Sequence, residues 1–134
     1  MTILAIDYGS KNVGLALVPD GMKMAVPLET IVNSGKWNLR TDLEHFVKEK
    51  NVDTVVVGMP YTMDGELGPQ AQEVQTFVDF LRDETGWTVE TVDERMSTQG
   101  AQRFAKEVGI SVDSAAAVLI AESYINTSSR KPGA

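Results

Sequence analysis

The chain has 134 residues, the length of one domain, and its 43% hydrophobic and 23% charged residues exclude wholesale disorder. It contains no cysteine and a single histidine, His45, which excludes a disulfide scaffold, a zinc–thiolate site and a thiol nucleophile. The formal net charge is −7, whereas proteins that bind nucleic acid non-specifically carry a basic stripe. Bound divalent cations invert the field at a carboxylate site, so the charge does not forbid a nucleic-acid substrate.

The N-terminal residues lack the basic region of a signal peptide, since Asp7 follows the first apolar run at once. No apolar stretch approaches the ~20 residues needed to cross a bilayer. We therefore expect a soluble, cytoplasmic protein with no membrane partner.

Residues 2–32 predict three strands. Apolar runs at Thr2–Ile6 and Val13–Val18 flank a glycine turn, and Pro19-Asp20-Gly21 marks the next turn. The third run, Met22–Val32, is interrupted by Pro27, which suits an edge strand or a bulge. Three strands joined by tight turns form an antiparallel meander.

The pattern then alternates between helices and strands. We expect helices at Asn38–Lys50, Pro69–Glu84, Thr98–Val108 and Val112–Ile125, and strands at Asp53–Gly58 and Trp87–Val92. The order β-β-β-α-β-α-β-α-α predicts an α/β fold with a mixed five-stranded sheet. Right-handed crossovers place the last two strands parallel to the first, so their carboxyl ends share one edge, where such sheets bind ligands. Residues 1–126 form the single predicted domain, and residues 127–134 a flexible tail.

Acidic residues fall at three places along this edge. Asp7 ends the first strand, Asp93 and Glu94 end the fifth, and Asp113 lies in the first turn of the last helix. Carboxylates without histidine or cysteine suit Mg²⁺ or Mn²⁺. A pair of such ions ~3.5–4 Å apart activates water and stabilises the leaving oxygen in phosphodiester cleavage. The pattern thus predicts metal ligands among these residues.

Each acid also has an ordinary structural interpretation. Asp113 can complement the helix dipole, worth ~0.3–1 kcal/mol. Asp93 and Glu94 can be solvated loop charges. Asp7 is harder to explain in this way, because an acid directly after a buried strand is costly unless it is paired or bound to metal.

Two glycine-rich segments supply candidates for substrate binding. Lys11 lies in the turn after Asp7, where backbone N–H groups can approach a phosphate; the alternative is a tight hairpin with positive φ at Gly9. Tyr61 lies in the long segment between a buried strand and a helix N-terminus, where it can stack on a base.

Two further candidates follow the fifth strand. Arg95 can hold a phosphate bidentately or form a salt bridge with the acids before it. Thr98 can donate to a phosphate or cap its helix, and capping is the commoner role.

Four blocks of sequence resemble the YqgF family over roughly residues 3–124. The blocks are Ile6-Asp7-Tyr8-Gly9-Ser10-Lys11-Asn12-Val13-Gly14, Val57-Gly58-Met59-Pro60 through Met63-Asp64-Gly65 and Gly68-Pro69, Asp93-Glu94-Arg95-Met96-Ser97-Thr98, and Asp113-Ser114-Ala115-Ala116-Ala117. The family contains RNase H-like proteins to which Holliday-junction resolution or pre-16S ribosomal RNA cleavage is attributed. Asn12 stands where the family usually has Arg, and the lysines often found before Asp113 are missing.

The resemblance implies a three-layer RNase H-like fold and a nuclease centre at Asp7, Glu94 and Asp113 that uses Mg²⁺ or Mn²⁺, with Glu94 preferred to Asp93. The implied substrate is structured RNA, in 5′-end maturation of pre-16S rRNA, with ribosomal precursors as partners. The alternative is branched DNA, and a resolvase that cuts two symmetric strands would be a homodimer. A third alternative is a non-catalytic partner in ribosome assembly. Sugar kinases and actin-like ATPases open with a similar turn but need two such domains, for which the chain is too short.

Overall fold

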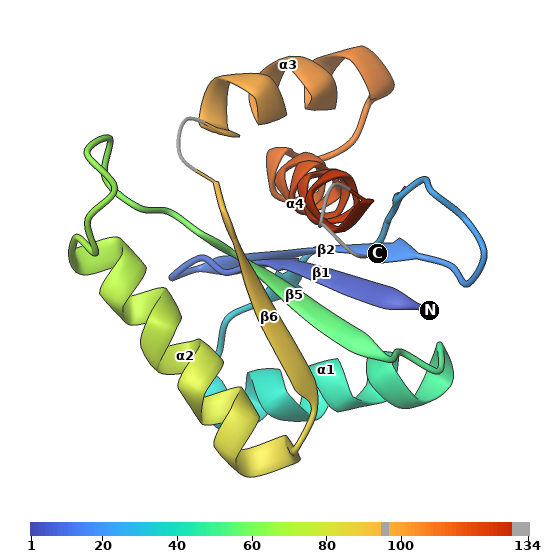
Figure 1. Cartoon of the computed structure of the whole chain (residues 1–134), viewed down its shortest axis with the longest axis vertical. Helices are drawn as coiled ribbons and strands as arrows, with labels where there is room; N and C mark the ends of the chain where they lie inside the picture. The colour runs from blue at the N-terminus through green and yellow to red at the C-terminus, as the bar shows by residue number, and fades with distance from the viewer. Residues whose placement is uncertain (95–96, 130–134) are drawn as a thin grey trace.

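The computed structural model describes residues 1–94 and 97–129, without the side chains of residues 97–99 and 127–129. The strands are β1 (Ile3–Asp7), β2 (Asn12–Val18), β3 (Val26–Pro27), β4 (Ile31–Val32), β5 (Thr54–Met59) and β6 (Thr88–Asp93). The helices are α1 (Lys36–Glu49), α2 (Pro69–Thr85), α3 (Ser97–Val108) and α4 (Val112–Ser129). They form three layers, with the sheet between α1 and α2 on one face and α4 on the other (Figure 1).

The sheet has the topology that the sequence predicts. Its order is β3-β2-β1-β5-β6, with β4 paired to β2 off this path. Strand β1 is antiparallel to β2 and parallel to β5, and β5 is parallel to β6. The carboxyl ends of β1, β5 and β6 therefore meet at one edge, as expected from the crossover rule.

The predicted third strand is divided into β3 and β4, so the prediction of five strands is wrong by one. Pro27 ends β3 because it has no N–H for a ladder, and Leu28 N then donates to Leu15 O at 2.9 Å. The chain next leaves β2, and Thr30 Oγ1 lies 3.0 Å from Ser111 Oγ, just before α4. Pairing with β2 resumes at Ile31–Val32.

The helix ends agree closely with the sequence pattern. Helix α2 begins at Pro69 and stops at Gly86, which adopts the left-handed conformation with φ 73°. Helix α4 continues to Ser129, three residues into the segment expected to be a tail. Residues 130–134 of that predicted tail lie outside the described part of the chain.

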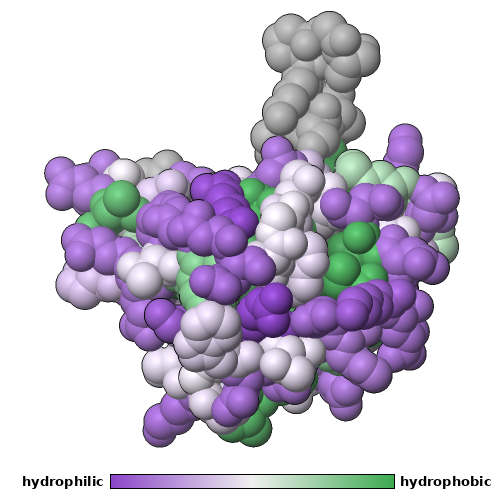
Figure 2. Space-filling view, turned by 90° about the horizontal axis from the view of Figure 1, so that it is seen from below, coloured by the Kyte–Doolittle hydropathy of each residue, from purple (hydrophilic) through white to green (hydrophobic). Residues whose placement is uncertain are grey.

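Large side chains fill the layer between the sheet and α1 and α2. Alternate residues of the strands, such as Leu4 and Ile6 of β1, pack against Leu39 and Leu43 of α1 and against the apolar side of α2. The outer face of these two helices is mostly hydrophilic, with small pale and hydrophobic patches between the polar side chains (Figure 2).

Small side chains fill the layer between the sheet and α4. Ala5 and Ala16 of the sheet face Ala117 and Ala121 of α4, and α3 packs on α4 through a second set of buried alanines. These small contacts bring the start of α4 to the edge of the sheet where β1 ends. Among the described residues no single helix is long and apolar enough to cross a bilayer; α3 and α4 reach that size only together, across a bend of 112°.

Candidate active site

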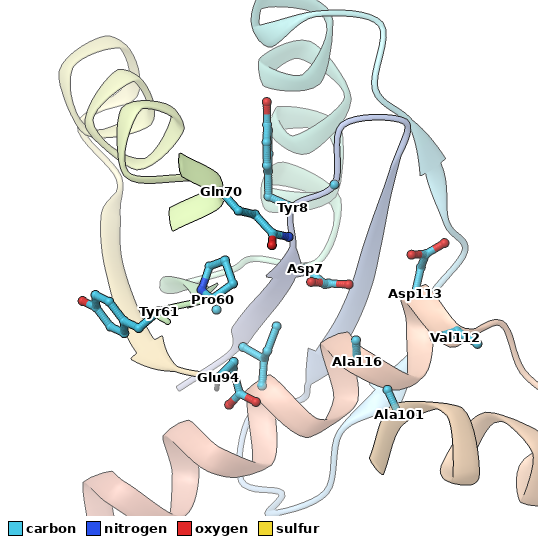
Figure 3. A pocket seen from close by; sticks show the side chains of 13 residues that line it. Asp7, Tyr8, Pro60, Tyr61, Gln70, Glu94, Ala101, Val112, Asp113 and Ala116 are labelled. Carbon is cyan, nitrogen blue, oxygen red and sulfur yellow. The ribbon is translucent and has the colours of Figure 1, made fainter. Parts of the chain in front are cut away.

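A cleft of about 390 Å³ opens at the carboxyl edge of the sheet (Figure 3). Asp7, Glu94 and Asp113, the three acids expected at the catalytic centre, all line it. Asp7 lies in the middle, with Asp113 on one side and Glu94 on the other (Figure 3). The rest of the lining is Tyr8, Gly9, Gly58, Pro60, Tyr61, Gln70, Ala101, Val112, Ala116 and Ile120.

Strand alternation decides which acids enter the cleft. Ala5 of β1 faces α4, so Asp7, two residues later, points to the same face. Val92 of β6 also packs in the layer beside α4, which places Glu94 on that side and Asp93 on the other. Asp93 is exposed and is absent from the lining of the cleft. The geometry thus favours Glu94 over Asp93.

Gly14 brings Asp113 to Asp7. Gly14 lies opposite Asp7 in the β1–β2 ladder. A Cβ atom at Gly14 would lie only 1.9 Å from the backbone oxygen of Asp113, so only glycine leaves room for the start of α4. This contact between β2 and α4 fixes the backbone of Asp113 beside the end of β1.

Three hydroxyl groups hold the start of α4 from the other side. Ser111 Oγ accepts from the Ser114 backbone N–H at 3.0 Å and thereby caps the helix. Ser114 is buried, and its hydroxyl lies 2.9 Å from Ser111 Oγ and donates to Leu28 O at 2.9 Å. Thr30 Oγ1 lies 3.2 Å from Ser114 Oγ. This hydroxyl cluster (Thr30, Ser111 and Ser114) ties α4 to the segment between β3 and β4, next to Asp113.

Glu94 is placed by one backbone hydrogen bond and by the space that Gly58 leaves for its side chain. Its backbone N–H donates to Met59 O at 3.0 Å, which extends the β5–β6 contact by one residue. A Cβ at Gly58 would lie 2.6 Å from Ile120 Cδ1 and 3.0 Å from Glu94 Cγ, so the absence of a side chain at Gly58 makes room for both. The Glu94 side chain lies between the sheet edge and α4.

The carboxyl of Asp7 is hard to ionise in this position. Burial raises its pKa from 3.8 to about 6, and the negative charge of Asp113 adds to the rise. An acid at the end of a buried strand is costly in its charged form, and no ion pair with a described residue offsets that cost.

Glu94 has a similar environment. Burial raises its pKa from 4.5 to about 7; a hydrogen bond with Ser123 opposes the rise, and the charges of Asp93 and Asp7 add to it. Its Oε1 atom is buried and has no hydrogen-bond partner among the described residues. Asp7 and Glu94 are thus two largely buried carboxyls whose charges no ion pair with a described residue neutralises, a donor pair that suits a cation.

The donor set fits a hard divalent cation, but the described residues contain no group of three His, Cys, Asp or Glu side chains close enough to hold one. Mg²⁺ is commonly bound by one or two carboxylates, water and substrate phosphates rather than by a complete protein cage. The Glu94 Oε1 atom, which no described residue contacts by a hydrogen bond, and the raised pKa of Asp7 fit such a partial site.

The predicted substrate-binding residues lie at different places relative to the cleft. Tyr61 lines the cleft and is half-buried. Lys11 is exposed in the turn between β1 and β2 and is absent from the lining. The turn itself does not use positive φ at Gly9; a Cβ there would lie 2.4 Å from Asn12 O, so glycine is needed for a close backbone approach. Arg95 and the side chain of Thr98 lie outside the described part of the structure.

Two polar residues of the cleft, Tyr8 and Gln70, are not indicated as site residues by the sequence pattern. Tyr8 lines the cleft, and its ring lies 4.7 Å from the ring of Phe77. Gln70, directly after Pro69 in the first turn of α2, is exposed and extends its amide toward the cavity near Asp7 (Figure 3). The available signal for Gln70 was its position at a helix N-terminus that follows a β-strand.

Comparisons with known proteins agree with this architecture. A family model described as "RuvX: Holliday junction resolvase" matches residues 1–127. A Chloroflexus aurantiacus protein named "Putative pre-16S rRNA nuclease" is 34% identical, covering 97% of this chain and 90% of its own length. A Clostridioides difficile protein of the same name is 38% identical, covering 92% and 93%.

Two solved structures share the fold at low sequence identity. RuvC of Thermus thermophilus in complex with a Holliday junction substrate has a TM-score of 0.61 and 16% identity, with 97% of each chain covered. The fowlpox virus resolvase bound to Holliday junction DNA has a TM-score of 0.59 and 12% identity, covering 95% of this chain and 98% of that one. Both likenesses confirm the predicted RNase H-like fold.

Proposed function

Because the chain belongs to the RuvX family, described as Holliday junction resolvase and also known as YqgF, we propose that it is a divalent-metal-dependent nuclease with its centre at Asp7, Glu94 and Asp113. One observation carries the proposal. Three acids distant in sequence line one cleft, and two of them, Asp7 and Glu94, have raised pKa values there. Such perturbed acids in a cleft mark a functional site.

In this proposal, different residues of the cleft have different roles in hydrolysis. Asp7, Glu94 and Asp113 would hold Mg²⁺ or Mn²⁺, which supplies activation of water and neutralisation of phosphate charge when bound. Gln70 presents a neutral amide that can donate to a phosphate oxygen without adding charge to the site. Tyr61 borders the cleft where a neighbouring base would lie.

Structured RNA, namely the 5′ region of pre-16S rRNA, is the substrate that the relatives favour. Two relatives matched over nearly full length are named "Putative pre-16S rRNA nuclease" and are 34% and 38% identical. The junction-bound neighbours are only 16% and 12% identical. Lys11 and Arg95 are the candidate contacts to phosphates that flank the scissile bond.

A cleavage assay tests the proposed centre. The substrates are an RNA that spans the 5′ end of 16S rRNA and a four-way DNA junction, each with Mn²⁺ or Mg²⁺. We expect Asp7→Asn and Asp113→Asn to lower kcat/KM by about a thousandfold or more, because each removes a metal-binding charge. Asp42→Asn, the same change at an exposed position of α1, should cut as the native protein does. Undiminished cleavage by Asp7→Asn would exclude this centre.

The family description favours one second candidate, resolution of branched DNA. A resolvase that cuts two symmetric strands needs two copies of the centre, so it would act as a homodimer. Light scattering with and without junction DNA separates the candidates. A dimer that makes paired, symmetric nicks supports the resolvase, and a monomer that cuts only RNA supports rRNA maturation.

A further inference from the structure

Aromatic rings form a continuous track from Tyr8, the residue after Asp7, to the outer surface of α1 and α2. Tyr8 borders the cleft directly after Asp7, and its side chain extends away from the cavity (Figure 3), with its ring 4.7 Å from Phe77. Phe77 lies 6.5 Å from Phe80 in a stacked arrangement, and Phe80 lies 4.9 Å from Trp37 in an edge-to-face arrangement. Trp37 is 56% exposed, although it is the largest side chain of the track. We call Tyr8, Phe77, Phe80 and Trp37 the aromatic track.

The outer end of the track is positively charged. Lys36 Nζ lies 5.0 Å from the centre of the Phe80 ring, a cation–π distance. Neither Lys36 nor Lys11 forms an ion pair with the residues that the structure describes. Other cations of these helices are neutralised, as in the pair of Lys48 with Glu44 at 2.8 Å. The charge at Lys36 is therefore available to a ligand.

Backbone contacts connect this end to the active-site turn. Asn33 Nδ2 donates to Gly9 O at 2.8 Å, and the Asn33 backbone N–H donates to Lys11 O at 2.8 Å. The segment before α1 is thus attached to the turn that follows Asp7. Lys36 and Trp37 follow this attached segment directly, at the start of α1.

We infer that Trp37 and Lys36 bind one or two unpaired nucleotides that flank the cleavage site, with a base stacked on Trp37 and its phosphate near Lys36. The inference rests on the proposed nuclease function. Stacking on an aromatic ring is favourable for every base, because every base has a π-face. It would supply affinity that a chain of net charge −7 lacks from phosphate contacts.

The surroundings favour a short nucleotide segment over a protein partner. A stable protein interface buries about 800 Å² on each side and has an apolar centre. The face formed by α1 and α2 is mostly hydrophilic (Figure 2). Acids such as Glu73, Asp79 and Asp83 are exposed on α2, which disfavours a long run of phosphates. One exposed tryptophan beside one unpaired lysine matches a single stacked base.

Binding is best measured in Asp7→Asn protein, which does not cut the probe. The two probes are one RNA hairpin with an unpaired twelve-nucleotide flank and the same hairpin with a blunt end. We expect Trp37→Ala to weaken binding of the flanked hairpin by roughly 5- to 100-fold and to leave blunt-hairpin binding unchanged. Trp37→Phe should restore most of the affinity. Met24→Ala, which removes another exposed apolar side chain, should have no effect.

Fluorescence gives a second, direct readout. The chain has two tryptophans, and Trp87→Phe leaves Trp37 as the sole reporter. Stacking predicts that the flanked hairpin quenches this emission and that the blunt hairpin does not. Circular dichroism checks that the Trp87→Phe variant is folded. The affinity measurements with Trp37→Ala do not use the Trp87→Phe variant.

The outcomes separate the two proposals. Equal affinity of Trp37→Ala and its parent for the flanked hairpin would overturn the inference. A Trp37→Ala variant that changes the oligomeric mass of the protein but not its affinity for RNA would overturn it as well. If the native protein with Mn²⁺ cleaves neither RNA nor junction DNA, the proposed function fails. Normal native cleavage together with unaltered Trp37→Ala binding overturns the nucleotide site alone.

Discussion

The two ends of the cleft are positioned by different kinds of contact. At one end, the backbone of Asp113 lies against Gly14, and the hydroxyl cluster fixes the first turn of α4. At the other end, Glu94 shares the space above Gly58 with the Ile120 side chain and has one buried oxygen without a hydrogen-bond partner in the described part of the chain. Folding of the core therefore sets the Asp113 end, whereas rotation of a side chain can adjust the Glu94 end.

This difference explains why the acids line one cleft without forming a ready three-ligand group. Three fixed carboxylates at coordination distance would repel one another strongly in the absence of a cation. A fixed pair, Asp7 and Asp113, with an adjustable Glu94 lowers that cost. In the proposed mechanism, such a site would be completed by metal and substrate together.

The largest effect should come from Gly14→Ala. Its new Cβ would lie 1.9 Å from a backbone oxygen, so β2 and α4 must separate, which we expect to lower the free energy of unfolding by about 3 kcal/mol or more. Thermal or urea denaturation measures the loss. Gly21→Ala is a poor control because φ at Gly21 is 78°, so Gly100→Ala, where a Cβ comes no closer than 3.7 Å to a neighbouring atom, serves better. Equal stability of Gly14→Ala and native protein would contradict the close contact.

The next largest effect on stability should come from removing the charge of Asp7. Its pKa is raised in the folded state, so the folded protein holds a proton that the unfolded chain releases between about pH 4 and 6. Stability therefore falls as pH rises through this range and is level above it; Glu94 extends the fall to about pH 7. Without metal, Asp7→Asn should be more stable than native protein by about 2–3 kcal/mol at pH 8 and about equal at pH 4.

Denaturation of both proteins at the two pH values measures this difference. The same gain for Asp7→Asn at pH 4 and pH 8 would show that ionisation of Asp7 is not its cause.

The hydroxyl cluster should have an intermediate effect. Ser114→Ala leaves the Leu28 carbonyl without its donor and loosens the start of α4, at a cost of about 1–2 kcal/mol. The loss of kcat/KM should exceed what the loss of folding stability alone would cause, because Asp113 is the adjacent residue. Thr76→Ala removes an exposed hydroxyl that bonds Gln72 O at 3.0 Å within α2 and should change neither quantity. If the two variants behave alike, the cluster does not position Asp113.

The smallest effect on stability should come from Gly58→Ala. The atoms nearest its Cβ belong to the Ile120 and Glu94 side chains, which can move, so we expect a loss of about 1 kcal/mol. Gly58→Ala should also weaken Mn²⁺ binding, measured by calorimetry, by more than its small effect on stability suggests, because the Glu94 side chain must shift. Unchanged Mn²⁺ affinity would separate Gly58 from the position of Glu94.

Sequence patterns predicted the topology and the edge shared by Asp7 and the end of β6, because these follow from strand and turn signals along the chain. Alternating apolar runs give the strands, and the crossover rule places Asp7 and the end of β6 at one edge. The choice between Asp93 and Glu94 depends on which side chains of β6 point toward α4. The sequence does not show this, and the structure shows that Val89 faces α1 and α2 whereas Val92 faces α4.

Other features depend on contacts between distant segments, which no local pattern records. The division of the third strand depends on Thr30, which reaches residues 111 and 114. The role of Gly14 depends on the approach of α4, which begins almost a hundred residues later. The aromatic track likewise joins β1, α2 and α1 only after folding.

Calorimetric titration with Mn²⁺ tests the central claim most directly, because it needs no knowledge of the natural substrate. The native protein should bind Mn²⁺ at neutral pH, while Asp7→Asn and Glu94→Gln should bind it at least about tenfold more weakly. Asp93→Asn, which alters the exposed neighbour outside the cleft, should bind as the native protein does. Equal Mn²⁺ affinity of native protein and Asp7→Asn would contradict a metal-dependent centre at the end of β1.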